Sequence, residues 1–77
     1  SGECRVERIN WIQPAPTEPI RVHTQVRYRH KAAASLLLPL QHNRAEVRFD
    51  APQSSIAPGQ GAAFYIGEEL IGGGLII

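Results

Sequence analysis

The chain has 77 residues, with eight Lys and Arg against seven Asp and Glu, and a formal net charge of +1. A chain of this length forms one small domain around a single modest core. The near-neutral charge gives no general preference for nucleic acid, so an RNA-binding surface would have to come from the local placement of basic residues. A single cysteine excludes an internal disulfide, as is typical of proteins from a reducing cytoplasm.

The longest apolar run, Ala32–Leu38 with Ser35 inside it, is far too short to cross a bilayer. No basic and then apolar leader precedes it. We therefore predict a cytoplasmic protein with no membrane partner. The chain does not begin with methionine, which predicts that it is a piece of a longer protein.

The first half of the chain contains two predicted strands and a connector. Residues 4–12 are rich in β-branched and aromatic types without clean alternation, which predicts a strand with an irregularity near Arg8. Residues 13–19 hold three of the six prolines and are predicted to be an extended connector. Residues 20–29 form the clearest strand, because apolar and polar residues alternate along them. Its inward positions are predicted to be Ile20, Val22, Thr24, Val26 and Tyr28.

The segment 32–40 is ambiguous, since its alanines and leucines favour a helix by intrinsic propensity. Its short length and Pro39 near its end favour a strand instead, with Leu36, Leu38 and Leu40 on one face.

A polar turn at 41–43 leads into residues 44–49, whose alternation predicts another half-buried strand, and 50–55 is predicted to be a loop.

The C-terminal stretch is predicted to be a hairpin. Pro58-Gly59 has the composition of a tight turn, and Gly67-Glu68 is predicted to be a two-residue loop between strands 61–66 and 69–77. Three glycines in a row, Gly72–Gly74, weaken an ordinary strand unless they mark a bulge, a barrel corner or a close backbone approach. With the earlier segments, the pattern predicts an all-β fold, a small antiparallel β-barrel of about six strands over residues 1–77.

Several short motifs recur in a fixed order along nearly the whole chain. They are Ile9-Asn10-Trp11-Ile12, Val26-Arg27-Tyr28-Arg29, Phe49-Asp50-x-Pro52-x-x-x-Ile56, Pro58-Gly59-Gln60, Phe64-Tyr65-x-Gly67-Glu68 and Gly72-Gly73-Gly74-x-Ile76. Together they resemble the C-terminal end of the bacterial tRNA-specific 2-thiouridylases.

The resemblance implies that residues 1–77 are the C-terminal β-barrel domain of a longer multidomain enzyme, a tRNA-uridine 2-sulfurtransferase. The barrel would be similar to the second domain of translation elongation factors. In the family, the enzyme adenylates C2 of the wobble uridine and installs sulfur delivered as a persulfide. The implied role of the barrel is to bind and position tRNA. The implied partners are tRNA, the remaining domains and a sulfur-relay protein.

The resemblance also implies ATP as cofactor of the parent enzyme, but none in this chain. The Ser-Gly-Gly-x-Asp-Ser motif of the family's ATP site is absent from the sequence. Gly72–Gly74 is followed by neither a phosphate-loop lysine nor a strand-to-helix transition.

No catalytic or metal-binding residue is predicted. Cys4 lacks the motifs of the family's sulfur-carrying cysteines and is predicted to be inert. Asp50 precedes a proline turn and is predicted to cap loop amides. Glu68 and Glu69 are adjacent, so they would point to opposite faces of a strand and form no acid–base pair. The histidines lack a second ligand at metal spacing and are predicted to lie on the surface; they are His23, His30 and His42.

The remaining candidate site is the outward face of the second strand and its exit. This basic stripe consists of Arg21, His23, Gln25, Arg27, Arg29 and Lys31. Alternate residues on a strand stand about 6.6 Å apart, close to the spacing of successive phosphates. We predict tRNA contacts at Arg21, His23, Arg27, Arg29 and Lys31, with Arg27 and Arg29 contributing most.

Two alternatives remain open. The stripe could be a solvated strand face partly neutralised by Glu46 or Asp50. The barrel could instead be a protein-interaction or structural domain, with its basic face against the enzyme's other domains or a sulfur-relay partner. An apolar docking face would then lie around Trp11 and Leu37. Aromatic residues other than Trp11 are predicted to be structural; they include Tyr28, Phe64 and Tyr65.

Overall fold

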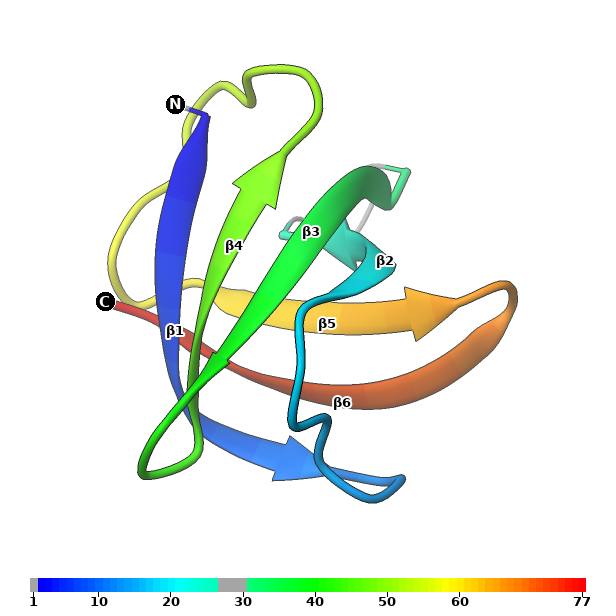
Figure 1. Ribbon diagram of the computed structural model, residues 1–77. Coiled ribbons are helices and arrows are strands. Elements are labelled where there is room, and N and C mark those ends of the chain that lie inside the picture. Colours follow the sequence, from blue (N-terminus) through cyan, green and yellow to red (C-terminus); the bar gives the residue numbers. More distant parts are fainter. Residues whose placement is uncertain (1, 27–30) are drawn as a thin grey trace.

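The computed structural model describes residues 2–26 and 31–77, and all regular structure in these two ranges is β-strand (Figure 1). The six strands are β1 (Glu3–Trp11), β2 (Ile20–Gln25), β3 (Ala33–Leu40), β4 (Arg44–Phe49), β5 (Gly61–Ile66) and β6 (Glu69–Ile76). They form a closed barrel in the order β1-β4-β3-β2-β5-β6, with every neighbouring pair antiparallel. The predicted all-β barrel of about six strands is confirmed.

The predicted strand boundaries agree with the structure to within a few residues. The largest difference is in β2, which was predicted to reach residue 29 but ends at Gln25, with Val26 outside it. Residues 27–30 lie outside the described residues, so the inward position predicted for Tyr28 has no structural counterpart here. The connector at 13–19 contains no strand, as its prolines predict. In the described part of the chain, no helix has the length and apolar character to cross a membrane.

The core fills the interior of the barrel, with one side-chain parity each from β2, β3, β4 and β5. The irregular strands β1 and β6 contribute buried residues of both parities, Val6 and Ile9 in β1 and Ile71 and Ile76 in β6. In β4, Ala45, Val47 and Phe49 point inward, while in β2 the inward positions are Val22 and Thr24. The complete buried apolar set is Val6, Ile9, Val22, Leu37, Ala45, Val47, Phe49, Ala62, Phe64, Ile71 and Ile76. Because the parity of β2 is fixed by this core, Arg21, His23 and Gln25 must lie on its outer face.

Strand β3 places three of its four leucines on the outer surface of the barrel. Leu36, Leu38 and Leu40 share one face, as predicted, but the residues buried between them are Ser35 and Leu37, both completely inaccessible. Leu37 lies opposite Val47 of β4, so the pairing register fixes this parity. The prediction that Leu37 belongs to an apolar docking face is therefore wrong, because that side chain is inside the core. Trp11, the other residue predicted for that face, is partly buried.

One polar pair is buried within the apolar core. Thr24 of β2 and Ser35 of β3 are both buried, and their hydroxyl oxygens lie 2.7 Å apart in a hydrogen bond. The Ser35 hydroxyl can also donate to the carbonyl of Ala33, at 3.2 Å. Each hydroxyl thus has a partner, which removes most of the cost of burying it.

Strand β1 bends around Arg8. This residue has a positive φ of 53°, and the pairing of β1 with β6 shifts register between Glu7 and Asn10. The irregularity predicted near Arg8 is confirmed as a bulge-like break in the ladder, which lets one strand pair with β4 at one end and β6 at the other.

The three consecutive glycines of β6 mark close approaches to neighbouring strands. A Cβ at Gly72 would lie 2.8 Å from Cε3 of Trp11, and one at Gly73 would lie 2.8 Å from the carbonyl oxygen of Ala62. At Gly74 a Cβ would overlap the carbonyl oxygen of Glu7. Of the explanations predicted for this motif, close backbone approach therefore applies. Positive φ is confined, among the described glycines, to the turns at Gly59 and Gly67.

Replacing Gly74 with alanine should destabilise the barrel by about 1–3 kcal/mol, the usual cost of overpacking a well-packed interior. The new methyl group would meet the Glu7 carbonyl oxygen and would also lie 2.9 Å from Cγ1 of Val6. Gly61→Ala is the matched control, because a Cβ there meets nothing closer than 3.9 Å. Urea unfolding of the two variants measures the difference, and equal midpoints would show that β6 can move away from β1.

The hydrogen bond between the buried hydroxyls of Thr24 and Ser35 can be measured by a double-mutant cycle. Thr24→Val should cost about 1 kcal/mol of unfolding free energy, because Ser35 loses its side-chain partner inside the core. Adding Ser35→Ala should recover part of that loss, since removing both partners leaves no unsatisfied group. The measurement is thermal or urea unfolding of both single variants and the double variant. Strictly additive losses would mean that the two hydroxyls do not interact.

Candidate nucleic-acid interface

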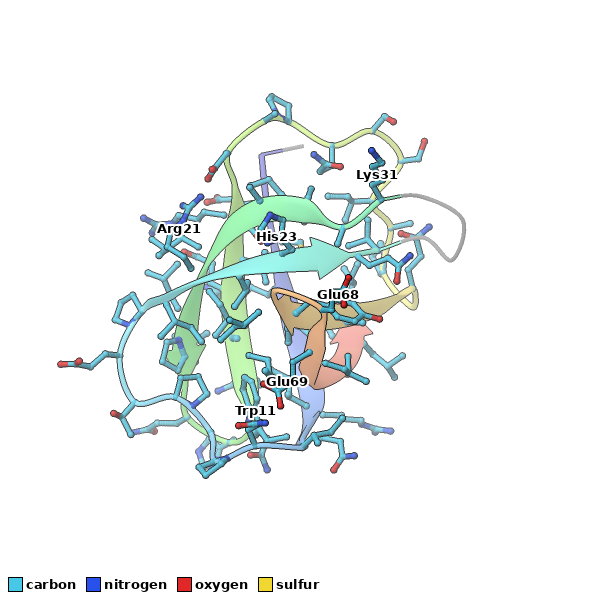
Figure 2. All side chains as sticks on the ribbon, turned by 90° about the vertical axis from the view of Figure 1, so that its right-hand side faces the viewer. Trp11, Arg21, His23, Lys31, Glu68 and Glu69 are labelled. Atoms are coloured by element: carbon cyan, nitrogen blue, oxygen red, sulfur yellow. The ribbon has the colours of Figure 1, made fainter. Side chains whose placement is uncertain are left out.

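The structure places the described part of the basic stripe on the outer surface of the barrel. Arg21 and His23 are exposed, Gln25 is half-buried, and the residues between them are in the core. Lys31 lies just before β3 and is exposed. Figure 2 shows Arg21, His23 and Lys31 along the same side of the molecule. The outward placement predicted for Arg21, His23 and Lys31 is thus confirmed, while their contact with RNA stays a prediction.

Two of the predicted tRNA contacts, Arg27 and Arg29, lie outside the described residues, as does His30. Their assignment to the stripe rests on the sequence alone. The other two histidines, His23 and His42, are exposed, as predicted.

Arg21 is paired with an acidic residue from a distant loop. Its guanidinium Nη2 donates a hydrogen bond to Oδ2 of Asp50, and the two side chains are 60% and 49% exposed. The hydrogen bond raises the pKa of Arg21 and lowers the pKa of Asp50. The Asp50 carboxylate was predicted to cap loop amides and instead binds Arg21. This pair neutralises part of the stripe, as the alternative with Asp50 predicted.

Glu46, the other acidic residue considered as a neutralising partner, faces a different cation. Its Oε2 accepts a hydrogen bond from Nε of Arg48 at 2.9 Å. Among the described residues, the stripe is therefore neutralised at Arg21 by Asp50, while Glu46 pairs with Arg48.

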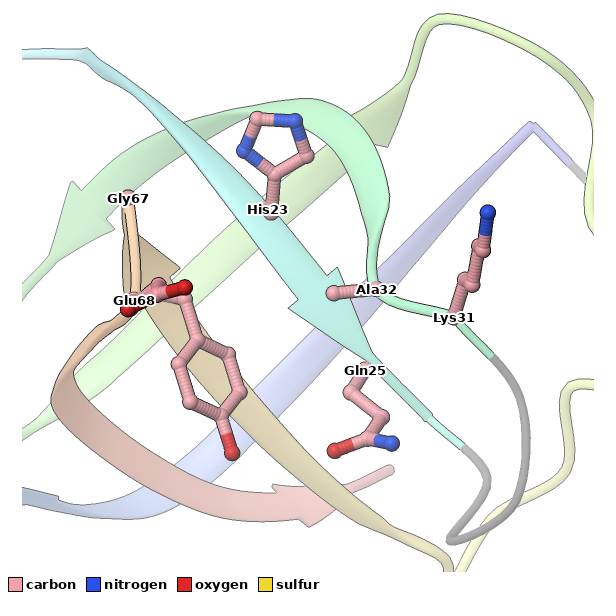
Figure 3. Close-up of a pocket in the computed structure, with 7 residues that line it drawn as sticks. His23, Gln25, Lys31, Ala32, Gly67 and Glu68 are labelled. Atoms are coloured by element: carbon pink, nitrogen blue, oxygen red, sulfur yellow. The ribbon is translucent and has the colours of Figure 1, made fainter.

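An open hollow lies beside the other end of the stripe, with a volume of about 690 Å³. Strand β2, the approach to β3, strand β5 and the β5–β6 turn all contribute to it, and its lining residues are His23, Gln25, Lys31, Ala32, Tyr65, Gly67 and Glu68 (Figure 3). His23 is paired across β2 and β5 with Tyr65, so the two side chains occupy one register position. Three residues of the predicted stripe, His23, Gln25 and Lys31, thus meet around one concave surface.

The sequence analysis missed the position of Tyr65. Its neighbour Phe64 is completely buried, and adjacent residues of a strand point to opposite faces. Tyr65 is therefore on the outer face and half-buried, although it was predicted to be structural. The parity rule applied to Phe64-Tyr65, with the larger apolar ring assigned to the core, would have found it.

The hollow carries opposite charges at its two sides. Figure 3 shows Lys31 on one side and Glu68 on the other, with Gln25 and Ala32 between them. A ligand with one anionic group and one hydrogen-bond donor would match this separation.

The structure shows the surroundings of two residues that were considered for catalysis, Cys4 and Glu69. Burial raises the pKa of the half-buried Cys4 thiol to about 11, so very little of it is thiolate at neutral pH. Oε2 of Glu69 accepts a hydrogen bond from Nε2 of Gln13 at 2.7 Å, which ties the connector to the β5–β6 hairpin. Over residues 2–26 and 31–77, no three His, Cys, Asp or Glu side chains cluster as metal ligands.

The triple glycine does not fit a nucleotide phosphate site. Gly72–Gly74 lies inside strand β6, packed against β1 and β5. Phosphate loops instead present free backbone amides at a helix N-terminus. Gly72–Gly74 therefore does not have the form of a phosphate loop.

Residues 1–76 match the profile of the aminomethyltransferase β-barrel domain. Three similar curated proteins are each named tRNA-specific 2-thiouridylase MnmA. The protein from Rippkaea orientalis is 52% identical over 97% of this chain, the one from Microcystis aeruginosa 49% over 99%, and the one from Synechocystis sp. 46% over 99%. In each case the match covers 22% of the relative.

The closed six-stranded barrel and the profile match together define a small β-barrel domain. The chain belongs to the aminomethyltransferase β-barrel domain family. The predicted resemblance to the bacterial tRNA-specific 2-thiouridylases is confirmed. The chain spans about a fifth of the length of the curated relatives it matches.

The ion pair between Arg21 and Asp50 predicts that the pKa of the Asp50 carboxyl depends on Arg21. Because Asp50 has a lowered pKa in the folded chain, the pair stabilises the fold at neutral pH, and that contribution disappears as the pH falls through the folded-state pKa. Arg21→Gln should raise the pKa of Asp50 toward its ordinary value, whereas Arg48→Gln should not. Carbon-13 NMR of the Asp50 carboxyl measures both, and an unchanged pKa in Arg21→Gln would show that the pair does not form in solution.

Proposed function

We propose that this barrel is the non-catalytic, C-terminal tRNA-binding domain of a tRNA-uridine 2-sulfurtransferase. The observation that carries the proposal is the similarity of essentially the whole chain to proteins named tRNA-specific 2-thiouridylase. The parent enzyme would use ATP to activate the wobble uridine and then transfer sulfur to it, in the cytoplasm. Its chemistry, its ATP site and its contact with a sulfur-relay protein would belong to other domains.

The surface of the barrel supports a role in placing RNA. Lys31 and His23 are exposed beside the hollow, and the sequence places Arg27 and Arg29 between them along the chain. Exposed cations bind phosphates without reading sequence, which is the contact that orients a large RNA. Arg21 contributes less in this proposal, because Asp50 already accepts a hydrogen bond from it.

A second candidate function is docking against another domain of the same enzyme. The outward leucines of β3 favour it: Leu36 and Leu38 are half-buried, and Leu40 is 44% exposed. This row lies next to β2, so RNA and a protein domain could occupy neighbouring faces of the barrel. Docking through leucines would depend only weakly on salt, whereas phosphate contacts weaken steeply as salt rises.

The test of the proposed function is an NMR titration of the isotope-labelled chain with an unmodified tRNA transcript, at low and then physiological salt. We expect shifts at Arg21–Lys31 and around the hollow that fade as the salt concentration rises. No shifts at concentrations where non-specific binding with a Kd of roughly 10⁻⁴ M would be visible would contradict tRNA binding by this domain.

Lys31→Ala should weaken the binding of tRNA whatever the RNA sequence. It should also reduce the magnitude of the slope of log K, the association constant, against log salt concentration by about one, the value expected for one lost phosphate contact. Arg5→Ala is the matched control, because Arg5 is an exposed cation on β1, which is not a neighbour of β2 in the barrel. Fluorescence anisotropy with labelled tRNA over a salt series measures both slopes. Equal slopes for Lys31→Ala and Arg5→Ala would remove Lys31 from the interface.

A further inference from the structure

Among the described residues that line it, the hollow combines two ring-bearing side chains, His23 and Tyr65, with one lysine, Lys31. Tyr65 and His23 are paired residues of antiparallel strands, and side chains at such positions lie close enough to form one surface. Gln25 and the small residue Ala32 line the hollow between the charged residues, and the Tyr65 side chain is only half-buried. A flat ligand can therefore approach the tyrosine ring from solvent.

Phosphate binding alone would require Lys31 but not the rings of Tyr65 and His23 beside it. A phosphate is recognised by cations and amides, and an aromatic ring adds nothing to that contact. Unpaired RNA bases are instead held by stacking on Tyr, Phe, Trp or His, with hydrogen bonds to the edge of the base. In a double helix the same base is stacked between its neighbours and cannot reach the ring.

The charges of the hollow fit the two ends of a nucleotide. Lys31 is placed to contact a phosphate, while the Glu68 carboxylate would repel a phosphate and can accept a hydrogen bond from an amino group of a base. Because the two residues lie on opposite sides of the hollow, they favour one orientation of the nucleotide across Tyr65.

We propose that this hollow binds one unpaired nucleobase of the RNA, stacked on Tyr65 beside His23, with its phosphate at Lys31 and its hydrogen-bonding edge toward Glu68. The inference rests on the proposed function and sharpens it. The barrel would recognise a loop or an unstacked nucleotide in addition to the charge of the RNA backbone.

The test compares a short single-stranded RNA with a blunt duplex made from the same strand, using the 77-residue chain and its Tyr65→Leu and Tyr65→Phe variants. Tyr65→Leu should lose about five- to a hundred-fold in affinity for the single strand, the range measured for removing one stacking aromatic residue, and little for the duplex. Tyr65→Phe should keep most of the affinity, because it keeps the ring. Leu75→Ala, at an exposed residue of β6, is the control for surface changes outside the hollow.

Two further measurements distinguish a loss of RNA affinity at the hollow from a loss caused by unfolding of a variant. The amide spectrum of each variant shows whether the barrel is intact, and His23→Ala tests the second ring if Tyr65→Leu does not fold. Ring-proton shifts of Tyr65 and cross-peaks to base protons in the wild-type complex would support stacking.

The outcomes separate this inference from the proposed function. If the single strand and the duplex bind equally, and the Tyr65 and His23 variants change neither affinity, the barrel binds RNA through phosphates and the stacking site is refuted. If neither RNA nor tRNA binds, both the proposed function and this inference fail. A loss for the single strand that Tyr65→Leu shows and Tyr65→Phe does not would establish the site.

Discussion

The barrel depends on how closely β6 approaches its two neighbours. Closing a sheet of only six short strands brings the last strand against the first, and here the contact runs along Gly72–Gly74. Trp11 occupies the space that a side chain at Gly72 would need, and its ring stacks on Phe64 with centroids 6.0 Å apart. The same glycines that weaken β6 as an isolated strand therefore permit the packing that stabilises the closed barrel.

The closed core fixes the surface chemistry. Side chains of adjacent residues in a strand point to opposite faces, so Arg21 and His23 face solvent when Val22 and Thr24 are inside the barrel. The pairing of β2 with β5 then brings Tyr65 next to His23, although the two residues are far apart in sequence. A core built for packing thus determines which polar and aromatic side chains can act together on the outside.

Local patterns in the sequence were sufficient for the strands, the turns and the outward face of β2, because alternation and turn residues report local geometry. They failed where the answer depended on strand pairing. In β3 every residue from Leu36 to Leu38 is a leucine, so only the register with β4 decides that Leu37 is inside. The pairing of Arg21 with Asp50 and the hollow at Tyr65 also depend on segments that meet only in the folded barrel. The parity of Phe64-Tyr65 was available from the sequence and was not used.

Closure has a further consequence for how the domain meets other molecules. Over the described residues, each of the six strands has a hydrogen-bonded neighbour on both sides, so none of them is an edge strand to which another strand could be added. Partners cannot extend this sheet in the way that many small β domains capture peptides, and copies of the chain cannot join edge to edge into larger sheets. Recognition is therefore left to side chains and loops, which can change between relatives while the backbone of the barrel stays the same.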